Sequence, residues 1–373
     1  MMQLLNSWQN QRLDQLPDQL QTALEDIVHQ LQIDSTFCIR HPAYKPLELP
    51  DDAIDRFQQL PADLQHKYLS LQLRSFLYGI YYNGAYKEIL TLDADTDDSM
   101  LHQNLENNTF QGVDLAFYER LHQSNRGTGY FDLGWQIVRQ EDETHWVVFK
   151  NGLTLHIERD RHLQPHDHTA AIGDAVAIRL PRNRLQNGFY MAIGNTNPSR
   201  EHHERSPQTV RIYFNLSPDG AVAVMDSLTQ QLNEQCLPFS FKVLYNPSDY
   251  GRYDSGVLYF DKGYYQAVKR VLQAVYLEHQ LHFRPEVPLF TKQLAPGLAL
   301  AEEPDQKFAD QESFGMNRCQ IVADALLEAR HQEKTAPGDR MAAIFTQFST
   351  LGIELWRSHL NASSDDIYTP LDL

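Results

Sequence analysis

Residues 210–281 alternate between strand-like and helix-like patterns, and this order constrains the fold more than any other feature of the chain. VRIYFNL (210–216) and FSFKVLY (239–245) have the pattern of strands, and Ser217 with Pro218 begins an amphipathic helix between them. A turn-rich loop, NPSDYGRYD, a third strand, SGVLYF, and a helix over about 264–281 follow. This order predicts a sheet with flanking helices, in the α+β class.

The first third of the chain has a different pattern. DQLQTALEDIVHQL (18–31) and HKYLSLQLRSFLYGIYYNG (66–84) have apolar residues at helical spacing, and residues 101–123 give a weaker third helix. Beyond RGTGYF (126–131) the runs become short and β-like, with a hairpin turn expected at KNG (150–152). We predict a helical N-terminal domain, 1–125, and a domain with a mixed sheet and flanking helices, 126–373.

Composition excludes several classes of protein. No apolar run reaches the length of about 18 residues that a membrane span needs, and the N-terminus lacks the pattern of a secretory signal. Three dispersed cysteines fit free thiols in a reducing compartment, so we expect a cytoplasmic protein with no zinc site. A formal charge of -17 argues against general nucleic-acid binding, although a local basic cleft remains compatible with it.

Strand alternation gathers cationic residues on one face of the predicted sheet. Arg211 and Tyr213 point opposite to the apolar residues of their strand, and Lys242 does the same in the next strand. If the intervening helix packs on the apolar faces, these three residues share the other face. The loop adds Arg252, and SFGMNR adds Arg318 near a helix start.

Guanidinium groups and helix N-termini both bind phosphate, so this set predicts a phosphate site. Lys292, in TKQLAPG, is a further candidate for a phosphate or peptide contact. The alternative is that all of these residues are ordinary strand and loop cations in surface ion pairs. The pattern by itself leaves both interpretations open.

Three segments resemble a known family: VRIYFNLSPDGAVAV, FKVLYNPSDYGRYDSGVLYF and TKQLAPGLALAEEPDQKFADQESFGMNRCQIVADAL. They look like the HopA-type effector family of bacteria, over roughly residues 130–370. Relatives of that family include the stand-alone lyase component of class V lanthipeptide synthetases. The family is also similar in fold to the phosphothreonine lyases of type III secretion.

The resemblance implies a role for each candidate. Lys242 would be the base that removes the α-proton of phosphoserine or phosphothreonine, since neighbouring arginines and burial favour a neutral amine. Arg211, Arg252 and Arg318 would bind the phosphate and stabilise its developing charge. Where the lyases have a histidine acid this chain has Tyr213, a phenol whose pKa of about 10 makes it a poorer acid at neutral pH. Either Tyr213 is the catalytic acid, or another group is, or the site binds without catalysis.

The resemblance therefore implies a lyase that needs no metal or cofactor and converts phosphorylated residues to dehydroalanine or dehydrobutyrine. Its substrate would be a ribosomally made precursor peptide phosphorylated by a partner kinase. Two alternatives stay open: a HopA-like module that binds a peptide or protein without catalysis, and an exported effector. No GxSxG, Walker, GxGxxG or HExxH motif is present, which argues against the commoner hydrolases, kinases, dinucleotide-binding enzymes and zinc proteases.

Histidines elsewhere are weaker candidates. His166 and His168 have the HxH spacing of some metal sites, but they lie in a polar segment without an obvious third ligand. His202 and His203 precede Arg211 and could supply a replacement acid, or they could belong to an exposed loop. His156 fits a half-buried strand position.

Overall fold

A seven-stranded sheet forms the centre of the molecule. The structure is a computed structural model that describes residues 15–34, 38–49, 51–92, 112–196 and 208–373. The strands lie in the order β13-β14-β10-β12-β11-β9-β8. Their bounds are β8 Asn183–Gln186, β9 Phe189–Ile193, β10 Thr209–Phe214, β11 Ser240–Leu244, β12 Gly256–Asp261, β13 Lys292–Ala295 and β14 Leu298–Glu302.

The predicted order of elements along 210–281 is confirmed. β10 is followed by α7 (Pro218–Glu234), β11, β12 and α8 (Tyr265–His279), and the Ser217 hydroxyl caps α7 by accepting from the Gly220 amide. β12 pairs antiparallel with both β10 and β11, so the two strands that α7 connects run parallel with β12 between them. The α+β class is confirmed, but each described pairing within the predicted mixed sheet is antiparallel.

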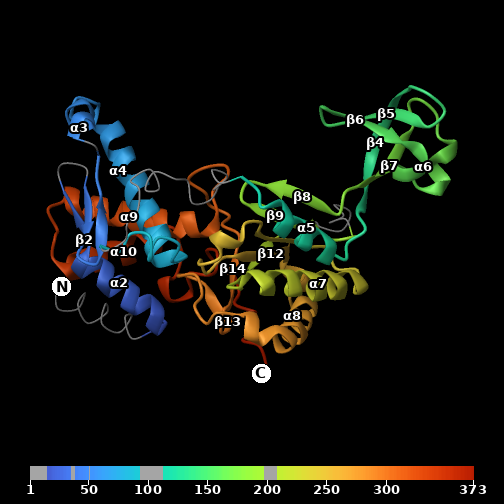
Figure 1. Ribbon diagram of the computed structural model, residues 1–373. Coiled ribbons are helices and arrows are strands. Elements are labelled where there is room, and N and C mark those ends of the chain that lie inside the picture. Colours follow the sequence, from blue (N-terminus) through green and yellow to red (C-terminus); the bar gives the residue numbers. More distant parts are fainter. Residues whose placement is uncertain (1–14, 35–37, 50, 93–111, 197–207) are drawn as a thin grey trace.

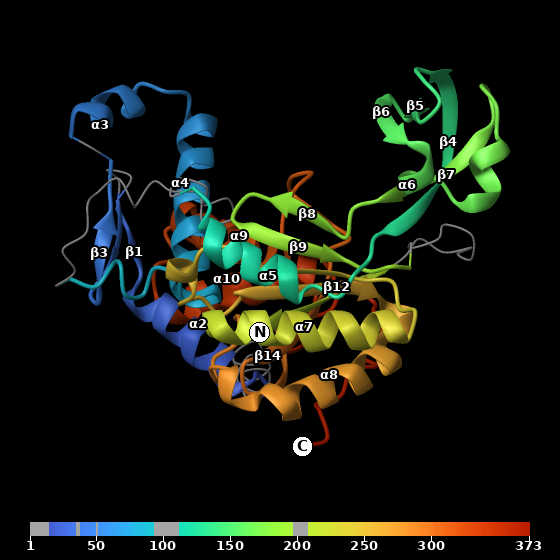
Figure 2. The ribbon, with the colours of Figure 1, turned by 45° about the vertical axis from the view of Figure 1, so that its right-hand side comes forward.

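Helices cover both faces of the sheet (Figures 1 and 2). On one face, Ile212 and Phe241 pack with α5 (Leu115–Ser124), α7 and α8 in one hydrophobic cluster. On the other face, Tyr213 and Val257 join a cluster built by helices from both ends of the chain. These are α2 Asp18–Gln30, α4 Ala62–Leu77, the π-helical turn η1 Tyr78–Tyr82, α9 Phe314–His331 and α10 Pro337–Thr350.

The N-terminal region contains a small sheet as well as the predicted helices. β1 (Gln32–Ile33), β2 (Ile39–His41) and β3 (Tyr44–Leu47) form it, and α3 (Asp51–Gln58) precedes α4. These three strands are only two to four residues long, which is too short to show an alternating pattern of apolar and polar residues. The sequence therefore did not predict them. Part of the weaker predicted helix, at 101–111, lies outside the described residues, and the domain boundary near Arg126 stays a prediction.

A four-stranded sheet, β6-β5-β4-β7, projects from the central sheet (Figures 1 and 2). Its strands and accompanying helices are β4 Tyr130–Gln140, β5 His145–Lys150, β6 Leu153–Glu158, α6 Arg159–His162, the 3-10 helix η3 Pro165–Thr169 and β7 Ala175–Leu180. Trp135, Trp146 and their neighbours form its own small core. The hairpin turn expected at 150–152 is confirmed, since Asn151 and Gly152 adopt positive φ angles of 50° and 82°.

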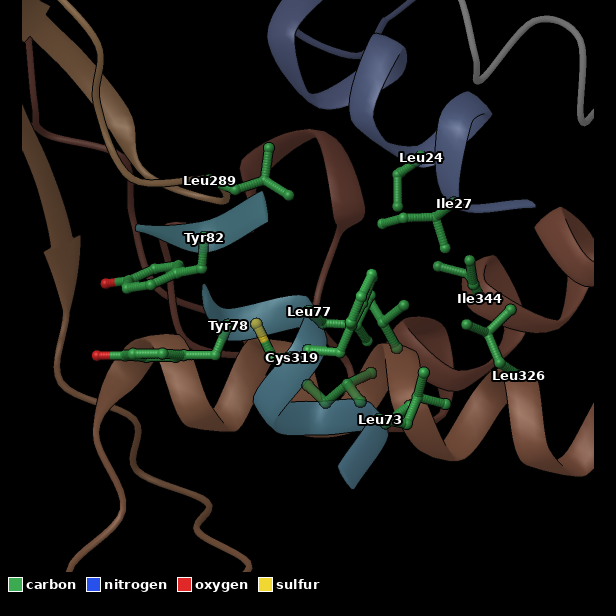
Figure 3. Packing of buried hydrophobic residues seen from close by; sticks show 14 of the residues in the cluster. Leu24, Ile27, Leu73, Leu77, Tyr78, Tyr82, Leu289, Cys319, Leu326 and Ile344 are labelled. Atoms are coloured by element: carbon green, nitrogen blue, oxygen red, sulfur yellow. The ribbon is translucent and has the colours of Figure 1, made fainter. Parts of the chain in front are cut away.

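Gly315 allows η1 to approach α9 closely. Tyr78 and Tyr82 stack at 4.9 Å between ring centroids, with their hydroxyls directed away from the aliphatic cluster around Leu73 and Leu77 (Figure 3). A Cβ added at Gly315 would overlap the Tyr82 ring. The absent side chain therefore fixes where Tyr82 lies.

We expect Gly315→Ala to lower the free energy of unfolding by about 1–3 kcal/mol, the usual cost of overpacking a core. Gly338→Ala is the control, because nothing lies within 4 Å of a Cβ at that helical position. Chemical denaturation of both variants measures the difference. Equal stability of the two variants would contradict the close contact with Tyr82.

The C-terminal tail, residues 358–373, contains no helix or strand, and a buried carboxylate anchors it. Glu302, at the end of β14, is 1% exposed. It accepts hydrogen bonds from Lys262 Nζ, Ser364 Oγ and Tyr368 Oη, each at 2.8 Å, and from the Asn361 amide at 3.0 Å. Burial opposes ionisation of Glu302, but these donors outweigh it and hold its pKa below the usual range.

This shift predicts an acid-sensitive contribution to stability. Because the folded pKa lies below the unfolded one, the contribution is complete above the unfolded pKa and is lost as pH falls through the folded pKa. We expect Glu302→Gln to cost about 2 kcal/mol at pH 7, the value of a charge-assisted hydrogen bond, and less at pH 3. Denaturation at both pH values, with exposed Glu333→Gln as control, tests this. A cost independent of pH would contradict it.

Candidate functional site

A cavity of about 280 Å³ lies on the face of the central sheet that carries Arg211, Tyr213 and Lys242. Four of the residues predicted from the sequence line it: Arg211, Tyr213, Lys242 and Arg252. The remaining lining residues are Tyr78, Tyr82, Gln186, Phe189, Asp254, Val257, Tyr259, Glu303, Lys307, Gln311, Glu312 and Ser313. The cavity therefore combines cations, carboxylates and aromatic rings.

Strand register brings Tyr213 and Lys242 onto one row of the sheet. Both residues pair with Val257, one from each side, and Arg211 lies on the next row beside Tyr259. Adjacent strands are about 4.8 Å apart, so the backbones of Tyr213 and Lys242 are separated by about 10 Å. The shared face predicted from strand alternation is confirmed.

Lys242 shares an aromatic neighbour with each of the two arginines. Its Nζ is 4.3 Å from the centroid of Phe189, whose ring also lies 5.9 Å from Arg252 Cζ. Its Nζ is 5.6 Å from the centroid of Tyr259, and Arg211 Cζ is 5.1 Å from the same ring. The amine donates a long hydrogen bond, 3.4 Å, to Gln186 Oε1. Each arginine thus shares an aromatic neighbour with the amine.

The arginines are held by carboxylates. Arg252 donates to both oxygens of Asp254, through Nε at 2.5 Å and Nη2 at 2.8 Å, and Arg211 forms an ion pair with Glu303, which Lys307 also contacts at 2.6 Å. Burial opposes ionisation of Asp254 and Glu303, but the paired guanidinium outweighs it and lowers the pKa of each carboxyl. Both guanidinium groups are therefore oriented by fixed negative partners.

Tyr213 is almost completely buried, with 2% of its surface exposed. Its ring packs edge-on against Tyr82 and is tilted against Phe314, at 6.3 Å between centroids in both cases. Burial raises the pKa of its hydroxyl well above the usual range, although Arg211 opposes the shift. The phenol is therefore neutral at physiological pH.

Arg318 does not line the cavity, contrary to the expectation from its spacing. It is 1% exposed and lies over the Phe314 ring at 4.9 Å. Its guanidinium donates to the carbonyl oxygens of Ser358 and Leu360, at 2.8 and 2.9 Å, and to Asn317 Oδ1 at 2.6 Å. Burial lowers its pKa to about 10. Helix α9 directs this side chain into the interior, where it ties the C-terminal tail to the body.

Lys292 also lies outside the cavity lining. It begins edge strand β13, and its Nζ pairs with Asp366 of the tail at 2.7 Å. His156 is exposed and pairs with Glu141 on the projecting sheet. His202 and His203 lie outside the described residues. In the part of the chain that the structure describes, His166 and His168 belong to no group of three side chains able to hold a metal.

Sequence reasoning missed several members of the cavity. Tyr78 and Tyr82 have helical spacing, which indicates core packing, and they do pack in the core while also lining the cavity. Glu303 and Lys307 follow β14 in the segment AEEPDQK. Its many charged residues are typical of a solvent-exposed loop. No local pattern marks them, because the pairing of β14 with β10 places them beside Arg211.

None of the helices in the described segments is long and apolar enough to cross a membrane. No functionally curated protein matches the chain. Two solved structures, both of effector proteins from Pseudomonas syringae, are similar over much of their length. The protein of pathovar tomato strain DC3000 is 16% identical, with a TM-score of 0.39 over 78% of this chain and 90% of that one. The protein of pathovar syringae strain 61 is 16% identical, with a TM-score of 0.42 over 83% and 97%.

A further similarity concerns the part of the chain that builds the cavity. A family match covers residues 180–360, a little under half of the 373 residues. This segment contains β10, β11, β12 and α9, and with them Arg211, Tyr213, Lys242 and Arg252. Residues 180–360 match the HopA1 effector protein family.

Proposed function

We propose that the cavity eliminates phosphate from phosphoserine or phosphothreonine in a peptide. The observation that carries the proposal is the presence of Lys242, Arg211 and Arg252 on the wall of one cavity. The reaction needs a base for the α-proton and cations for the departing phosphate. An amine and two guanidinium groups in one site supply both requirements.

The lining of the cavity has one more cationic than acidic residue, which favours an anionic ligand. Four cationic residues, Arg211, Lys242, Arg252 and Lys307, line it with three acidic ones, Asp254, Glu303 and Glu312. A phosphate group can compete with the carboxylates for the arginines, because guanidinium binds phosphate in the same bidentate manner. The existing ion pairs keep both arginines in place before the substrate arrives.

In the proposed reaction, the amine of Lys242 takes the α-proton. The electron pair of the Cα–H bond becomes the Cα=Cβ bond, and the Cβ–O bond breaks as its pair leaves with the phosphate. The departing phosphate takes up a proton from water and leaves as hydrogen phosphate, and Lys242 then releases the α-proton to water. The products are a dehydroalanine or dehydrobutyrine residue and inorganic phosphate. No oxidant or reductant is required, and we propose that neither metal nor cofactor takes part.

The substrate we propose is a ribosomally made precursor peptide in a lanthipeptide-type pathway. A partner kinase would phosphorylate it in the cytoplasm, and the N-terminal region would bind the peptide or the kinase. A binding module without catalysis is the second candidate. Tyr213 favours it, because this neutral phenol replaces the histidine acid of the phosphothreonine lyases.

Mass spectrometry separates the two candidates. The purified full chain is incubated with phosphoserine and phosphothreonine peptides, both alone and with the kinase that phosphorylates them. We expect the loss of phosphoric acid from the peptide and the release of inorganic phosphate. Peptide binding without any loss of phosphoric acid would refute the lyase and support the binding module.

A further inference from the structure

Two buried polar atoms on the cavity wall lack a hydrogen bond. They are the Tyr213 hydroxyl oxygen and Glu312 Oε1. Of the described side chains with such an atom, these two alone line the cavity. An unsatisfied buried polar group costs about 1–3 kcal/mol, so its presence requires an explanation. A ligand that pairs with both atoms would provide one.

Tyr213 presents its hydroxyl from a rigid position. The ring of Tyr213 packs against the rings of Tyr82 and Phe314. In the sheet, Val257 lies between Tyr213 and Lys242. The Tyr82 hydroxyl is close enough to influence that of Tyr213, but their geometry is not that of a well-formed hydrogen bond. The Tyr213 O–H is therefore available to a ligand on the same row as the amine.

Glu312 has one oxygen engaged and the other available. Its Oε2 accepts from the Phe308 amide and from Asn317 Nδ2, both at 2.9 Å. Glu312 is 5% exposed and immediately precedes Ser313, the N-cap of α9. These contacts fix the carboxylate of a residue that lines the cavity and leave its Oε1 without a partner. An ionised carboxylate can only accept hydrogen bonds.

We propose that Tyr213 and Glu312 form a subsite for the backbone of the phosphorylated residue. The Tyr213 hydroxyl donates to the carbonyl oxygen of that residue, and Glu312 Oε1 accepts from its amide N–H. One donor and one acceptor match the two polar groups that a peptide residue offers. This inference rests on the proposed elimination and assigns its enolate stabiliser and the recognition of its peptide.

The chemistry favours a donor at the carbonyl oxygen. When Lys242 takes the α-proton, negative charge develops on this oxygen, and a preorganised donor there stabilises the transition state. Burial keeps the Tyr213 phenol protonated, which suits a donor and opposes a role as acid for the departing phosphate. Tyr213 is thus placed in the enolate step instead of the leaving-group step.

Tyr213→Phe tests the subsite, because it retains the ring and removes only the hydroxyl. With a phosphoserine peptide that the wild type eliminates, we expect kcat to fall about 10²–10³-fold, the usual cost of losing an oxyanion donor. An α-deuterated substrate should show an isotope effect on kcat that is at least as large as in the wild type. If Tyr213 instead protonated the phosphate, C–O cleavage would become limiting and the isotope effect would fall towards one.

Glu312→Gln tests the acceptor. The amide can keep the contacts with Phe308 and Asn317 but places an NH₂ group at the cavity, so KM for the peptide should rise about tenfold, equivalent to one lost hydrogen bond. An N-methylated phosphoserine peptide should lose affinity for the wild type and not for this variant. Tyr264→Phe, on the exposed N-terminal end of α8, is the control.

The outcomes separate the inference from the proposed function. An active wild type with unchanged Tyr213→Phe or with a collapsed isotope effect overturns the subsite and leaves the lyase. An inactive wild type overturns both. Circular dichroism of the variants excludes loss of the fold as the cause of any effect.

Discussion

Lys242→Ala is expected to lower kcat for phosphate elimination by about 10²–10⁴-fold, the range that a positioned general base contributes. Lys242 shares the Tyr259 ring with Arg211 and the Phe189 ring with Arg252, so we expect its amine to reach a phosphorylated residue held by both guanidinium groups. Release of inorganic phosphate from a phosphothreonine peptide measures the effect.

Two further variants separate base catalysis from charge. Lys242→Arg places a guanidinium at this position that stays protonated and cannot take a proton at neutral pH, so it should be as inactive as Lys242→Ala while still binding the phosphopeptide. Lys150→Ala is the matched control, because this lysine also belongs to a strand but pairs with Asp132 in the projecting sheet. An active Lys242→Arg enzyme would exclude Lys242 as the base.

Arg318→Met is expected to lower the free energy of unfolding by about 3–5 kcal/mol. The substitution leaves the buried carbonyl oxygens of Ser358 and Leu360 without their donor, at about 1–3 kcal/mol each. It also removes a planar group packed on Phe314, so the C-terminal tail loses its attachment to α9. Chemical denaturation followed by circular dichroism measures the loss.

Arg357→Met is the control for this prediction. Arg357 lies in the same segment, but its side chain is 43% exposed and pairs with Glu354 three residues earlier, and such a pair contributes less than about 1 kcal/mol. The comparison also decides the role of Arg318. If Arg318→Met were as stable as the wild type and failed only in binding phosphopeptide, Arg318 would be a phosphate ligand after all.

Local sequence signals were sufficient to predict the secondary structure of residues 210–281. Ser217 and Pro218 begin α7 where the sequence places its cap, and the alternation in VRIYFN separates Ile212 from Arg211 and Tyr213. These signals are local, since a cap needs only the next three residues and strand alternation needs only a period of two. The sequence could therefore assign Arg211, Tyr213 and Lys242 to one face without knowing the order of the strands.

Tertiary structure decided what that face contacts. Pairing of β12 with β10 and β11 sets Tyr213 and Lys242 on one row, and pairing of β14 with β10 brings Glu303 to Arg211. Gly315 admits Tyr82 from the other end of the chain. Neighbours of this kind depend on register and close packing between segments far apart in sequence, and no local period encodes them.

For Arg318 too, the sequence predicted the secondary structure, whereas the packing decided the neighbours of the side chain. Its sequence position, five residues after the N-cap Ser313, predicts a helical residue near the start of α9, and this much is correct. Which side of the helix meets the cavity depends on how α9 packs against the sheet and the tail. That packing places Asn317 and Arg318 in the interior and leaves Glu312 and Ser313 at the cavity. The sequence thus determined the elements and their faces, whereas the packing of those elements decided which charges meet.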